Sequence, residues 1–532
     1  MFDGDLITIS NLWIVAAHDP ESIYNLSGIA VTYSMYDTPR GRCRATFIGR
    51  GLENDRISTG LLSEDIDQLC RTFSPGTAVS VMCTTTDENG SSDKNITLFS
   101  GYISSILDSL TNGAGQFQYE FSADIVTPEA LIPTNPTHLT HRISEDTSTL
   151  SLVSDWRLEE VLSKDNADGS QRGYGPEISE AIAALNNTNE LNIAKLAALV
   201  IDKSKIKTTK TSATDLPSTM SELFDADSAP ITRCPAGGAK SVAKSVVEMV
   251  TELQVNGRKS DWEAFVAVLR AFYQNPVPYI AEDIDQSQPG NTALLSIKQH
   301  MPWSPTYRRS IEPKEFIGFR NLHITALNGV YRAVAVAYPK GKGVIPGNEL
   351  NNYYLCAMGY DADGNPKWVE GEINEVSSTG YQLDGVNINN ILKMFLPNWL
   401  YSAVVESDKG GGSANYVDTW KQWAKNLAVT SVLSTIGAQG AMTLNTRLLP
   451  TIDIAKYLGE VVEVKLPVES PQEDSSLRTR PLYGLLRSVE FSIILKTDGL
   501  LANGKVTLDA VRTASEQSAF CMKSELFTDA AK

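Results

Sequence analysis

Hydrophobic and polar residues alternate along much of the first quarter of the chain. The stretches 44–49 and 78–83 alternate with a period near two, which is typical of strands that bury one face. Pro75-Gly76 predicts a turn before the second stretch, and the polar run 87–93 predicts a hairpin loop after it. We therefore expect residues 1–130 to form an antiparallel meander of strands.

Two further strands are expected in this region, at 96–103 and 118–123. The first of them contains Gly101, and a glycine inside a strand often marks a bulge or a sharp bend. The stretch 61–73 is an exception, because its apolar residues have the spacing of a short helix.

The pattern changes to helical spacing between residues 176 and 300. Apolar residues recur every three or four positions, for example along 242–253. The sequence Ser260-Asp261-Trp262-Glu263 is typical of a capping box and predicts that a helix begins there. Such apolar stripes are more often core than ligand site. The polar stretch 203–228 is expected to be a loop between helices.

The strand pattern returns from about residue 320. Residues 331–338 alternate, and 353–360 is the expected partner strand. The following stretch 361–366 matches the start of a calcium-binding loop, but the remaining ligand positions of such a loop are incomplete. A plain hairpin turn is therefore favoured. A helix is expected at 420–427.

These patterns predict an α+β fold that is mainly β, with a helical insertion. The 532 residues suggest three or four units, because domains commonly hold about 150 residues. Changes in pattern place the boundaries as follows: a first β domain at 1–150, a mostly helical insertion or lateral domain at 151–320, a mixed β/α domain at 321–440 and a second β domain at 441–532.

The two β ends of the chain resemble each other. Twenty-two residues separate Val79 from Gly101 in the first copy and Val462 from Gly484 in the second. Any two antiparallel meanders share alternation, but the equal spacing and the aromatic residue next to each glycine favour a true repeat. Each copy is expected to continue with a turn and a last strand: Asn112-Gly113 and 117–125 in the first, Asn503-Gly504 and 505–511 in the second.

Charge narrows the function classes. The formal net charge is −17, and residues 1–150 hold eight Lys and Arg against 19 Asp and Glu. The chain therefore lacks the basic footprint of a nucleic-acid-binding protein. An acidic surface has two possible explanations. It keeps the protein soluble, or it lets DNA slide past without binding. No apolar run is long enough to span a membrane, and the start of the chain lacks the pattern of a signal peptide.

Motifs that would carry chemistry are scarce. The sequence contains no HExxH, P-loop or GxSxG motif. The neighbouring acids Glu159 and Glu160 point to different faces of a helix, so they do not form a glycosidase pair. The cysteines lack CxxC spacing and are expected to be reduced and mostly buried: Cys43, Cys70, Cys83, Cys234, Cys356 and Cys521. Among the five histidines only His138 and His141 are close in sequence, and no acidic or cysteine cluster accompanies them. No catalytic, cofactor-binding or metal-binding residue is assigned.

These features resemble one known family. The aromatic-Ser-Gly-Tyr-Ile strand at 99–103, which follows an acidic loop, looks like the first tube domain of the tail hub proteins of tailed bacteriophages. The segments 458–464, 483–484 and 491–493 resemble the second tube domain of that family. Related domains occur in the spike proteins of type VI secretion and other contractile injection systems. The resemblance rests on glycine placement and alternation.

The resemblance covers roughly residues 1–150 and 320–515, and the helical segment departs from it. It implies two related tube-type antiparallel β-barrel domains in a homotrimer, which forms a pseudo-sixfold ring in the tail tip or baseplate of the virion. The implied partners are tail tube or distal tail protein rings, a central spike or tip protein and, as a further candidate, the tape measure protein. DNA would pass through the ring without specific binding, and assembly would take place in the host cytoplasm without a membrane. The family has no catalytic residues.

Two other readings remain open. A host-surface or carbohydrate-binding tail-tip module would need exposed aromatic side chains, and the candidates are Trp303, Tyr307, Trp368 and Trp399. A peptidoglycan or glycan hydrolase would need two carboxylates that face one cleft, and no sequence spacing indicates such a pair.

Overall fold

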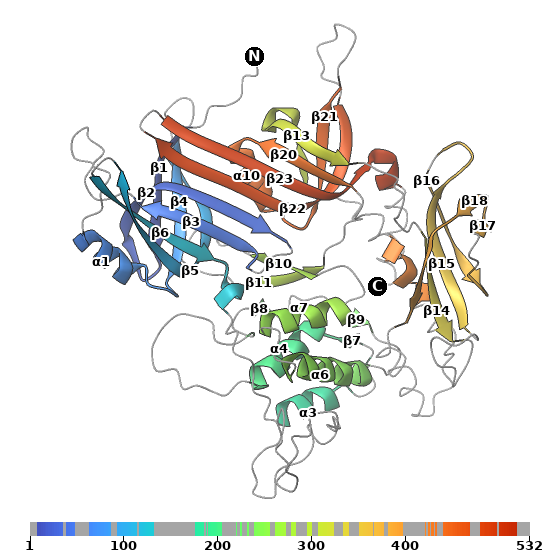
Figure 1. The fold of residues 1–532 in the computed structure, drawn as a ribbon. Helices are drawn as coiled ribbons and strands as arrows, with labels where there is room; N and C mark the ends of the chain where they lie inside the picture. Colours follow the sequence, from blue (N-terminus) through green and yellow to red (C-terminus); the bar gives the residue numbers. More distant parts are fainter. Residues whose placement is uncertain are drawn as a thin grey trace, which may run out of the picture.

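A computed structural model gives the fold, which is mainly β with large antiparallel sheets (Figure 1). All structural statements below concern the residues that it describes: 8–35, 39–47, 63–86, 93–113, 116–131, 176–185, 188, 190–204, 220, 224–225, 231–233, 239–255, 261–272, 278–282, 295–299, 307–323, 333–339, 351–364, 366–376, 381–396, 421, 424–425, 427–429, 431–432, 440–468, 479–496 and 499–518.

The first β unit is a circuit of six hydrogen-bonded strands. The strands follow the order β1-β4-β5-β6-β3-β2, and an additional pairing between β1 and β2 closes the circuit. The helix α1 and the short helix η1 accompany these strands. The bounds are β1 (Thr8–Ala16), β2 (Asp19–Ser34), β3 (Gly41–Phe47), α1 (Ser63–Thr72), β4 (Ala78–Thr86), β5 (Asp93–Gly113), β6 (Gln116–Val126) and η1 (Pro128–Leu131).

The second β unit repeats this order of strands. It runs β12-β21-β22-β23-β20-β13, with β12 parallel to β21 and the other neighbours antiparallel. The helix α10 precedes β21 in the chain as α1 precedes β4. The bounds are β12 (Arg309–Ile311), η3 (Pro313–Glu315), β13 (Phe316–His323), β20 (Ala441–Thr446), α10 (Leu448–Ala455), β21 (Val461–Pro467), β22 (Thr479–Lys496) and β23 (Gly499–Thr513).

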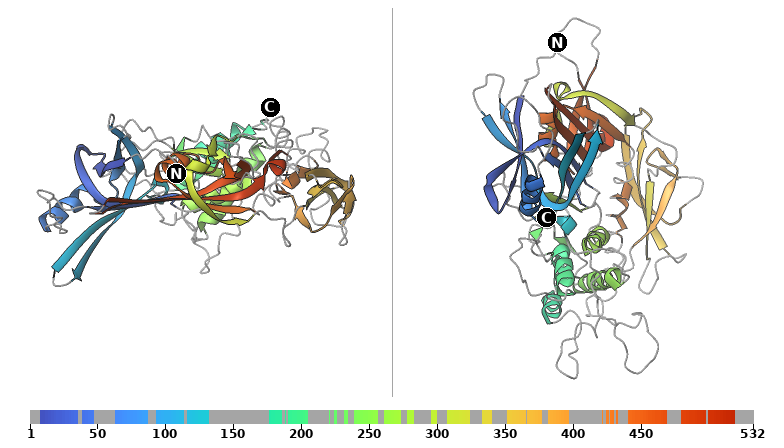
Figure 2. Two further views of the ribbon diagram at one scale, coloured as in Figure 1. Left: turned by 90° about the horizontal axis from the view of Figure 1, so that it is seen from above. Right: turned by 60° about the vertical axis from the view of Figure 1, so that its left-hand side comes forward.

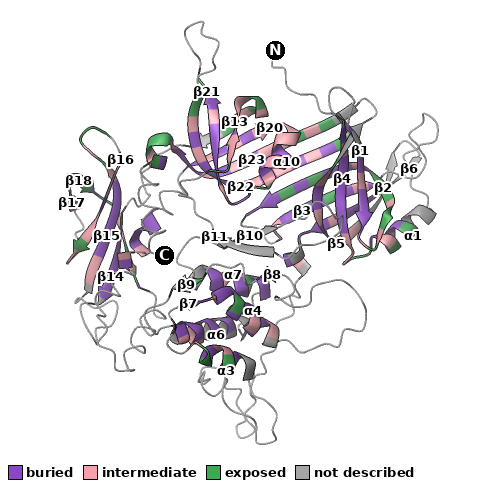
Figure 3. Cartoon of the chain, turned by 180° about the vertical axis from the view of Figure 1, so that it is seen from behind, coloured by how far each residue is buried: buried purple, intermediate pink, exposed green. Residues whose placement is uncertain are grey.

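One sheet and one core unite the two β units. The strand β22 also pairs with β2, so all twelve strands belong to a single sheet. Figure 1 shows β22 and β23 reaching from the second unit across to the first. Buried residues alternate with exposed ones along strands such as β3, as its sequence pattern predicts (Figure 3). The buried side chains of both units form one continuous hydrophobic cluster, which fixes each unit against the other.

The helical unit contains four main helices. Their bounds are α3 (Pro176–Ala183), α4 (Ile193–Ser204), α6 (Ala239–Val255) and α7 (Asp261–Phe272). The expected apolar stripes do form its core, and α7 begins one residue after Ser260, as the capping pattern predicts. Short strands lie beside these helices: β7 (Glu190–Leu191), β8 (Phe224–Asp225), β9 (Thr232–Arg233), β10 (Pro278–Glu282) and β11 (Leu295–Gln299).

The remaining unit is a four-stranded sheet with a hydrophobic cluster on each face. Its order is β16-β15-β14-β19, and the expected pairing of β14 with β15 is confirmed. Helical residues between 421 and 432 cover one face, and the hairpin β17–β18 packs on the other. The bounds are β14 (Ala333–Pro339), β15 (Asn351–Tyr360), β16 (Pro366–Ile373), β17 (Tyr381–Leu383), β18 (Val386–Ile388) and β19 (Ile391–Phe395).

The boundary that the sequence pattern places between residues 320 and 321 does not match the strand pairing. The strands β12 and β13 pair with β21 and β20, so residues 309–323 are part of the second β unit. The four-stranded unit is therefore inserted between β13 and β20 in the chain. Alternation within 441–513 could not reveal strands that are contributed from so far away in the sequence.

The prediction of a turn at Asn503-Gly504 is wrong. Both residues lie inside β23, opposite Ser492 and Phe491 of β22, and the hairpin turns between Lys496 and Gly499. Glycine occurs at position 504 because of close packing. A Cβ atom there would lie 2.0 Å from the Thr451 hydroxyl of α10. The first copy does turn just after Asn112-Gly113, between Gly113 and Gln116.

No helix in the described ranges is both long and apolar enough to cross a membrane.

Candidate assembly interface

The repeat inferred from sequence places equivalent residues opposite each other in both units. Val79 of β4 is the register partner of Gly101 in β5, and Val462 of β21 is the register partner of Gly484 in β22. The equal spacing therefore reflects equal strand register. Gly101 itself is not a bulge; it is needed because a Cβ atom there would lie 2.4 Å from the carbonyl oxygen of Val126.

The turn before β4 and β21 is also the same in the two copies. Gly76 and Gly459 each adopt a left-handed conformation, with φ of 90° and 82°, which glycine adopts at little cost. Each makes the same backbone bond to a residue two positions after the strand glycine. The bonds are Gly76 N to Ile103 O at 2.7 Å, Ile103 N to Thr77 O at 2.9 Å, Gly459 N to Leu486 O at 2.9 Å and Leu486 N to Glu460 O at 2.9 Å.

A bulge follows at the same point in both long strands. The register of β5 against β6 shifts between Ile103 and Ser105, and that of β22 against β23 shifts between Leu486 and Ser488. The two strands therefore have the same spacing from the glycine to this bulge, and β22 has a further register shift at Gly484 itself. Bulges increase local twist and bend the strand, so each strand leaves its own unit at this point.

Beyond its bulge, β22 is paired on both edges. One edge continues along β23, and the other pairs antiparallel with β2, from Gly28 opposite Ile494 to Ser34 opposite Ser488. The backbones approach closely at Gly28, where a Cβ atom would lie 3.1 Å from the carbonyl oxygen of Ile493. This pairing, which we call the internal joint, connects the two β units.

The equivalent stretch of β5 has an unoccupied edge within the described part of the chain. From Ser105 to Gly113 it pairs with β6 alone, and Figure 2 (left) shows this hairpin extending away from the rest of the first unit. Leu107 on this stretch is 40% exposed. A strand edge with unpaired N–H and C=O groups is a template for another strand.

The strand β13 carries the second unoccupied edge. It is the equivalent of β2, because it pairs with β20 as β2 pairs with β3 and has a bulge in the same place: between Leu26 and Gly28 in β2, and between Phe316 and Gly318 in β13. It pairs only with β20 among the described strands. Ile317 is 79% and Phe319 is 45% exposed, and a Cβ atom at Gly318 would meet nothing within 4 Å.

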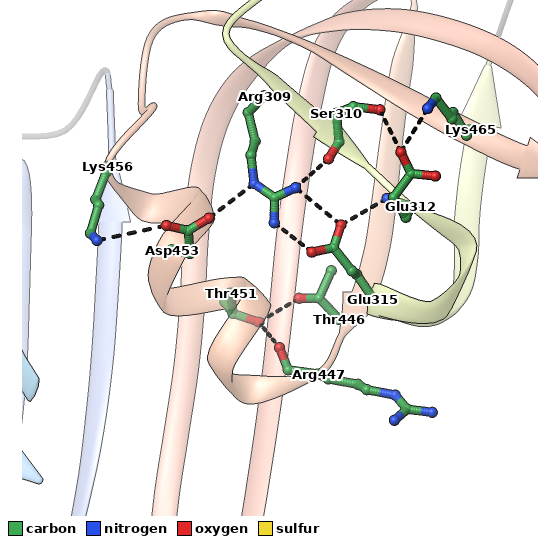
Figure 4. Close-up of polar contacts among 10 residues, drawn as sticks. All are labelled: Arg309, Ser310, Glu312, Glu315, Thr446, Arg447, Thr451, Asp453, Lys456 and Lys465. Carbon is green, nitrogen blue, oxygen red and sulfur yellow. Dashed lines mark hydrogen bonds and ion pairs between the residues drawn. The ribbon is translucent and has the colours of Figure 1, made fainter. Parts of the chain in front are cut away.

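A polar cluster holds β12 and η3 against α10, next to β13 (Figure 4). The guanidinium of Arg309 donates two hydrogen bonds to the Glu315 carboxylate, and its Nε donates to Asp453 Oδ2 at 3.0 Å. The backbone N–H of Glu312 donates to Glu315 Oε2 at 2.8 Å. Bidentate Arg–carboxylate pairs fix both distance and orientation, so this cluster sets the position from which β13 starts.

Further polar contacts tie β12 to β21 and β22. The buried Glu463 accepts hydrogen bonds from the hydroxyls of Ser310 at 2.9 Å and Tyr483 at 3.0 Å. Lys465 Nζ lies 2.7 Å from Glu312 Oε1, and this contact holds the pKa of Glu312 below its usual value. Each of these carboxylates contacts a cation or a hydroxyl on a neighbouring strand, so we assign them a structural role in holding β12 in place.

The solvent-facing side of the sheet near the internal joint carries paired charges. Ala30 and Thr32 are exposed on β2, and their register partners across the joint are Ser492 and Glu490. Three basic residues nearby each have an acidic partner: Arg44 with Asp124 at 2.9 Å, Lys505 with Glu490 at 2.9 Å and Arg487 with Asp509 at 3.5 Å. These three cations are therefore paired with carboxylates of the same sheet.

The two described aromatic residues proposed for ligand binding lie in different units. Tyr307 is 42% exposed but contacts Tyr483 in the second β unit, with ring centroids 5.6 Å apart and ring planes inclined at 56°. Trp368 belongs to the four-stranded unit, where it packs against the core and its indole N–H donates to Glu370 Oε2 at 3.5 Å. Trp303 and Trp399 lie outside the described residues.

The remaining candidates give no chemical site either. Cys43, Cys83 and Cys356 are buried and Cys70 is partly buried; none of these four is in a disulfide, and burial raises the pKa of Cys83 to about 12. Asp361 accepts hydrogen bonds from the Asp363 N–H at its side chain (3.0 Å) and from the Gly364 N–H at its carbonyl (3.1 Å), so residues 361–364 form a turn. No group of three potential metal ligands occurs within the described ranges. Cys234, Cys521, His138, His141, Glu159 and Glu160 lie outside them.

No family model matches the chain, and no curated protein matches it significantly.

Proposed function

We propose that this chain is a structural subunit that forms a ring, namely the hub protein of a bacteriophage tail tip or baseplate. The observation that carries this proposal is the duplicated order of strands. The order β1-β4-β5-β6-β3-β2 recurs as β12-β21-β22-β23-β20-β13, and the internal joint connects the two copies. In the proposal both units are tube-type barrels.

Three chains of this kind place six similar units around one axis. Such a ring matches a sixfold tail tube on one side and a threefold spike or tip on the other. Ring closure also removes exposed strand edges, which are otherwise sites of aggregation. The proposed partners are the tube or distal tail rings, the spike or tip protein and the tape measure protein, and the proposed location is the virion.

The solvent-facing side of the sheet supports a role in DNA passage. Phosphate binding depends on lysine and arginine that are available to release counterions. The basic residues Arg44, Arg487 and Lys505 of this face are each held by a carboxylate. A lumen lined by this face would let DNA slide without strong binding. In this proposal the chain has no catalytic site, cofactor or metal.

The test is an electron-microscopy reconstruction of purified particles, with this chain traced at the tail tip. We expect three copies around the axis, with both β units alternating around one lumen and the Ala30–Thr32 face turned inward. Copies attached only at the periphery of the tail would contradict the proposal. They would favour the host-surface or carbohydrate-binding module instead.

A further inference from the structure

We propose that the unoccupied edge of β13 pairs antiparallel with the unoccupied edge of β5 in a second copy of this chain. This pairing, the external joint, would reproduce the internal joint between different molecules. It rests on the proposed ring function and deepens it, because it names the strands, the register and the partner. The occupant of each edge is the other edge of an identical chain.

The equivalence of four strands carries this inference. The strand β22 corresponds to β5 by its glycine and its bulge, and β2 corresponds to β13 by its pairing and its bulge. In the internal joint β2 and β22 pair within one molecule. The other combination, β13 with β5, is unpaired among the described residues of one chain, although each strand shares the glycine and the first bulge of its paired equivalent.

The internal joint also fixes the register of the external one. Gly28 lies opposite Ile494, ten residues after Gly484, and the equivalent positions are Gly318 and Thr111. Counting antiparallel from this pair gives the remaining positions. The expected partners are Gly318 with Thr111, Phe319 with Leu110 and Arg320 with Ser109; a second register shift in β13, between Arg320 and His323, has no counterpart in β2 and ends the correspondence there.

The glycine in β13 is explained by this register. Gly28 is close to the neighbouring strand, since a Cβ atom would lie 3.1 Å from the Ile493 carbonyl oxygen. Gly318 occupies the same position of the repeat, but a Cβ atom there would meet nothing within 4 Å of the isolated chain. The absent side chain leaves room for an incoming strand. Exposed Ile317 and Phe319 beside it would lose water contact when that strand arrives.

The arrangement favours a ring over a simple twofold dimer. Each chain offers two different edges, one on β13 and one on β5, so the contact is heterologous. A heterologous contact repeats in one rotational direction and forms a ring when that rotation closes, as it does in the proposed hub. Internal and external joints would then alternate around the ring.

Disulfide trapping tests the register directly. We expect the double variant Phe319→Cys with Leu110→Cys to form an intermolecular disulfide between positions 319 and 110, because opposed residues in antiparallel strands have Cβ atoms about 4.5–5.5 Å apart. Non-reducing electrophoresis and peptide mapping identify the bond and the number of linked chains, which should not exceed three. The matched control is Phe319→Cys with Thr111→Cys, whose side chains would lie on opposite faces and should give at least a tenfold lower yield.

A second variant tests the glycine without perturbing the fold. Gly318→Val should leave the unfolding midpoint of the isolated chain unchanged and should raise the concentration needed for ring formation at least tenfold, as measured by mass photometry. Rings that cross-link through other residues, or that tolerate Gly318→Val, overturn the external joint and leave the ring function standing. A chain that stays monomeric and unlinked at its highest soluble concentration overturns the inference. Tail-tip density then decides the proposed function separately.

Discussion

Glycines in this protein differ in how much space surrounds them, and that space predicts the cost of a methyl group. A Cβ atom would lie 2.4 Å from backbone at Gly101 and 3.1 Å from the Leu508 side chain at Gly484, and it would meet nothing at Gly318. We expect alanine to destabilise the chain in this order, with a loss of about 1–3 kcal/mol or more at Gly101 and less than about 0.5 kcal/mol at Gly318. Urea denaturation of the three variants measures the series. Equal losses at all three positions would contradict it.

The contact between Glu312 and Lys465 predicts a pH dependence. Lys465, through its hydrogen bond and charge, lowers the pKa of Glu312 from the usual 4.5. A carboxyl whose pKa is lower in the folded state stabilises the fold at neutral pH, and this contribution is lost as the pH falls from about 4.5 through the folded pKa. Glu312→Gln should therefore lower the urea denaturation midpoint more at about pH 7, where the carboxylate is charged, than at about pH 3, where it is largely protonated.

A double-mutant cycle separates this contact from other effects of the substitution. Lys465→Met removes the cation that lowers the pKa of Glu312. In that background the effect of Glu312→Gln should be smaller and should depend less on pH. An unchanged pH dependence would show that another group is responsible.

At the scale of elements, Arg309 connects β12, η3 and α10. Its side chain is only 19% exposed, and it bonds to both Glu315 and Asp453. Arg309→Gln should cost about 2–3 kcal/mol, because hydrogen bonds between charged groups are lost and a carboxylate is left without its partner. We expect faster hydrogen exchange in β12 and β13, with little change in β4–β6. The neighbouring Arg308→Gln is the control, because that side chain is 71% exposed and its ion pair contributes little.

The pairing of β4 with β5 and of β21 with β22 was predictable because it is local. The spacing from Val79 to Gly101 and from Val462 to Gly484 indicated a repeat, and the structure places each valine opposite its glycine. The helical core was predictable for the same reason, since the stripe of each helix lies within a single segment. In these cases the residues that make contact are close in sequence.

Other features depend on contacts that a short pattern does not carry. The strand at Phe316–His323 shares only a small apolar-and-glycine motif with β2, and its partner β20 lies beyond an inserted unit. Asn503-Gly504 has the composition of a turn, yet α10 packs against Gly504 and the strand continues. The candidate interface could not be predicted from the sequence for the same reason. Whether a strand edge is unoccupied depends on which other strands pair in the folded sheet.

At the scale of the whole molecule, the duplicated unit relates folding to assembly. The internal joint forms as the chain folds, because β2 and β22 share one hydrophobic core. The equivalent edges of β13 and β5 gain a partner only when a second copy arrives. In the proposal the same strand pairing is thus used within one chain and between chains. The units inserted after η1 and after β13 leave the twelve-stranded sheet uninterrupted.

The three ion pairs on the solvent-facing side of the sheet lead to a prediction about DNA binding. The triple variant Asp124→Asn, Glu490→Gln and Asp509→Asn removes the carboxylates that hold Arg44, Lys505 and Arg487. Each cation made available for phosphate should steepen the slope of log affinity against log salt by about 0.9. Fluorescence anisotropy with a short duplex across a salt series should show little binding by the original chain and salt-sensitive binding by the variant.

Net charge alone would also strengthen DNA binding, so the control must change the charge equally elsewhere. Glu180→Gln with Glu190→Gln and Glu375→Gln neutralises three exposed carboxylates outside the twelve-stranded sheet. If the paired charges of the sheet keep DNA from binding, the first variant should bind at least tenfold more tightly than this control at low salt, because its cations lie on neighbouring strands and can contact one duplex together. Equal affinity of the two variants would mean that overall charge, and not the pairing on this face, keeps DNA from binding.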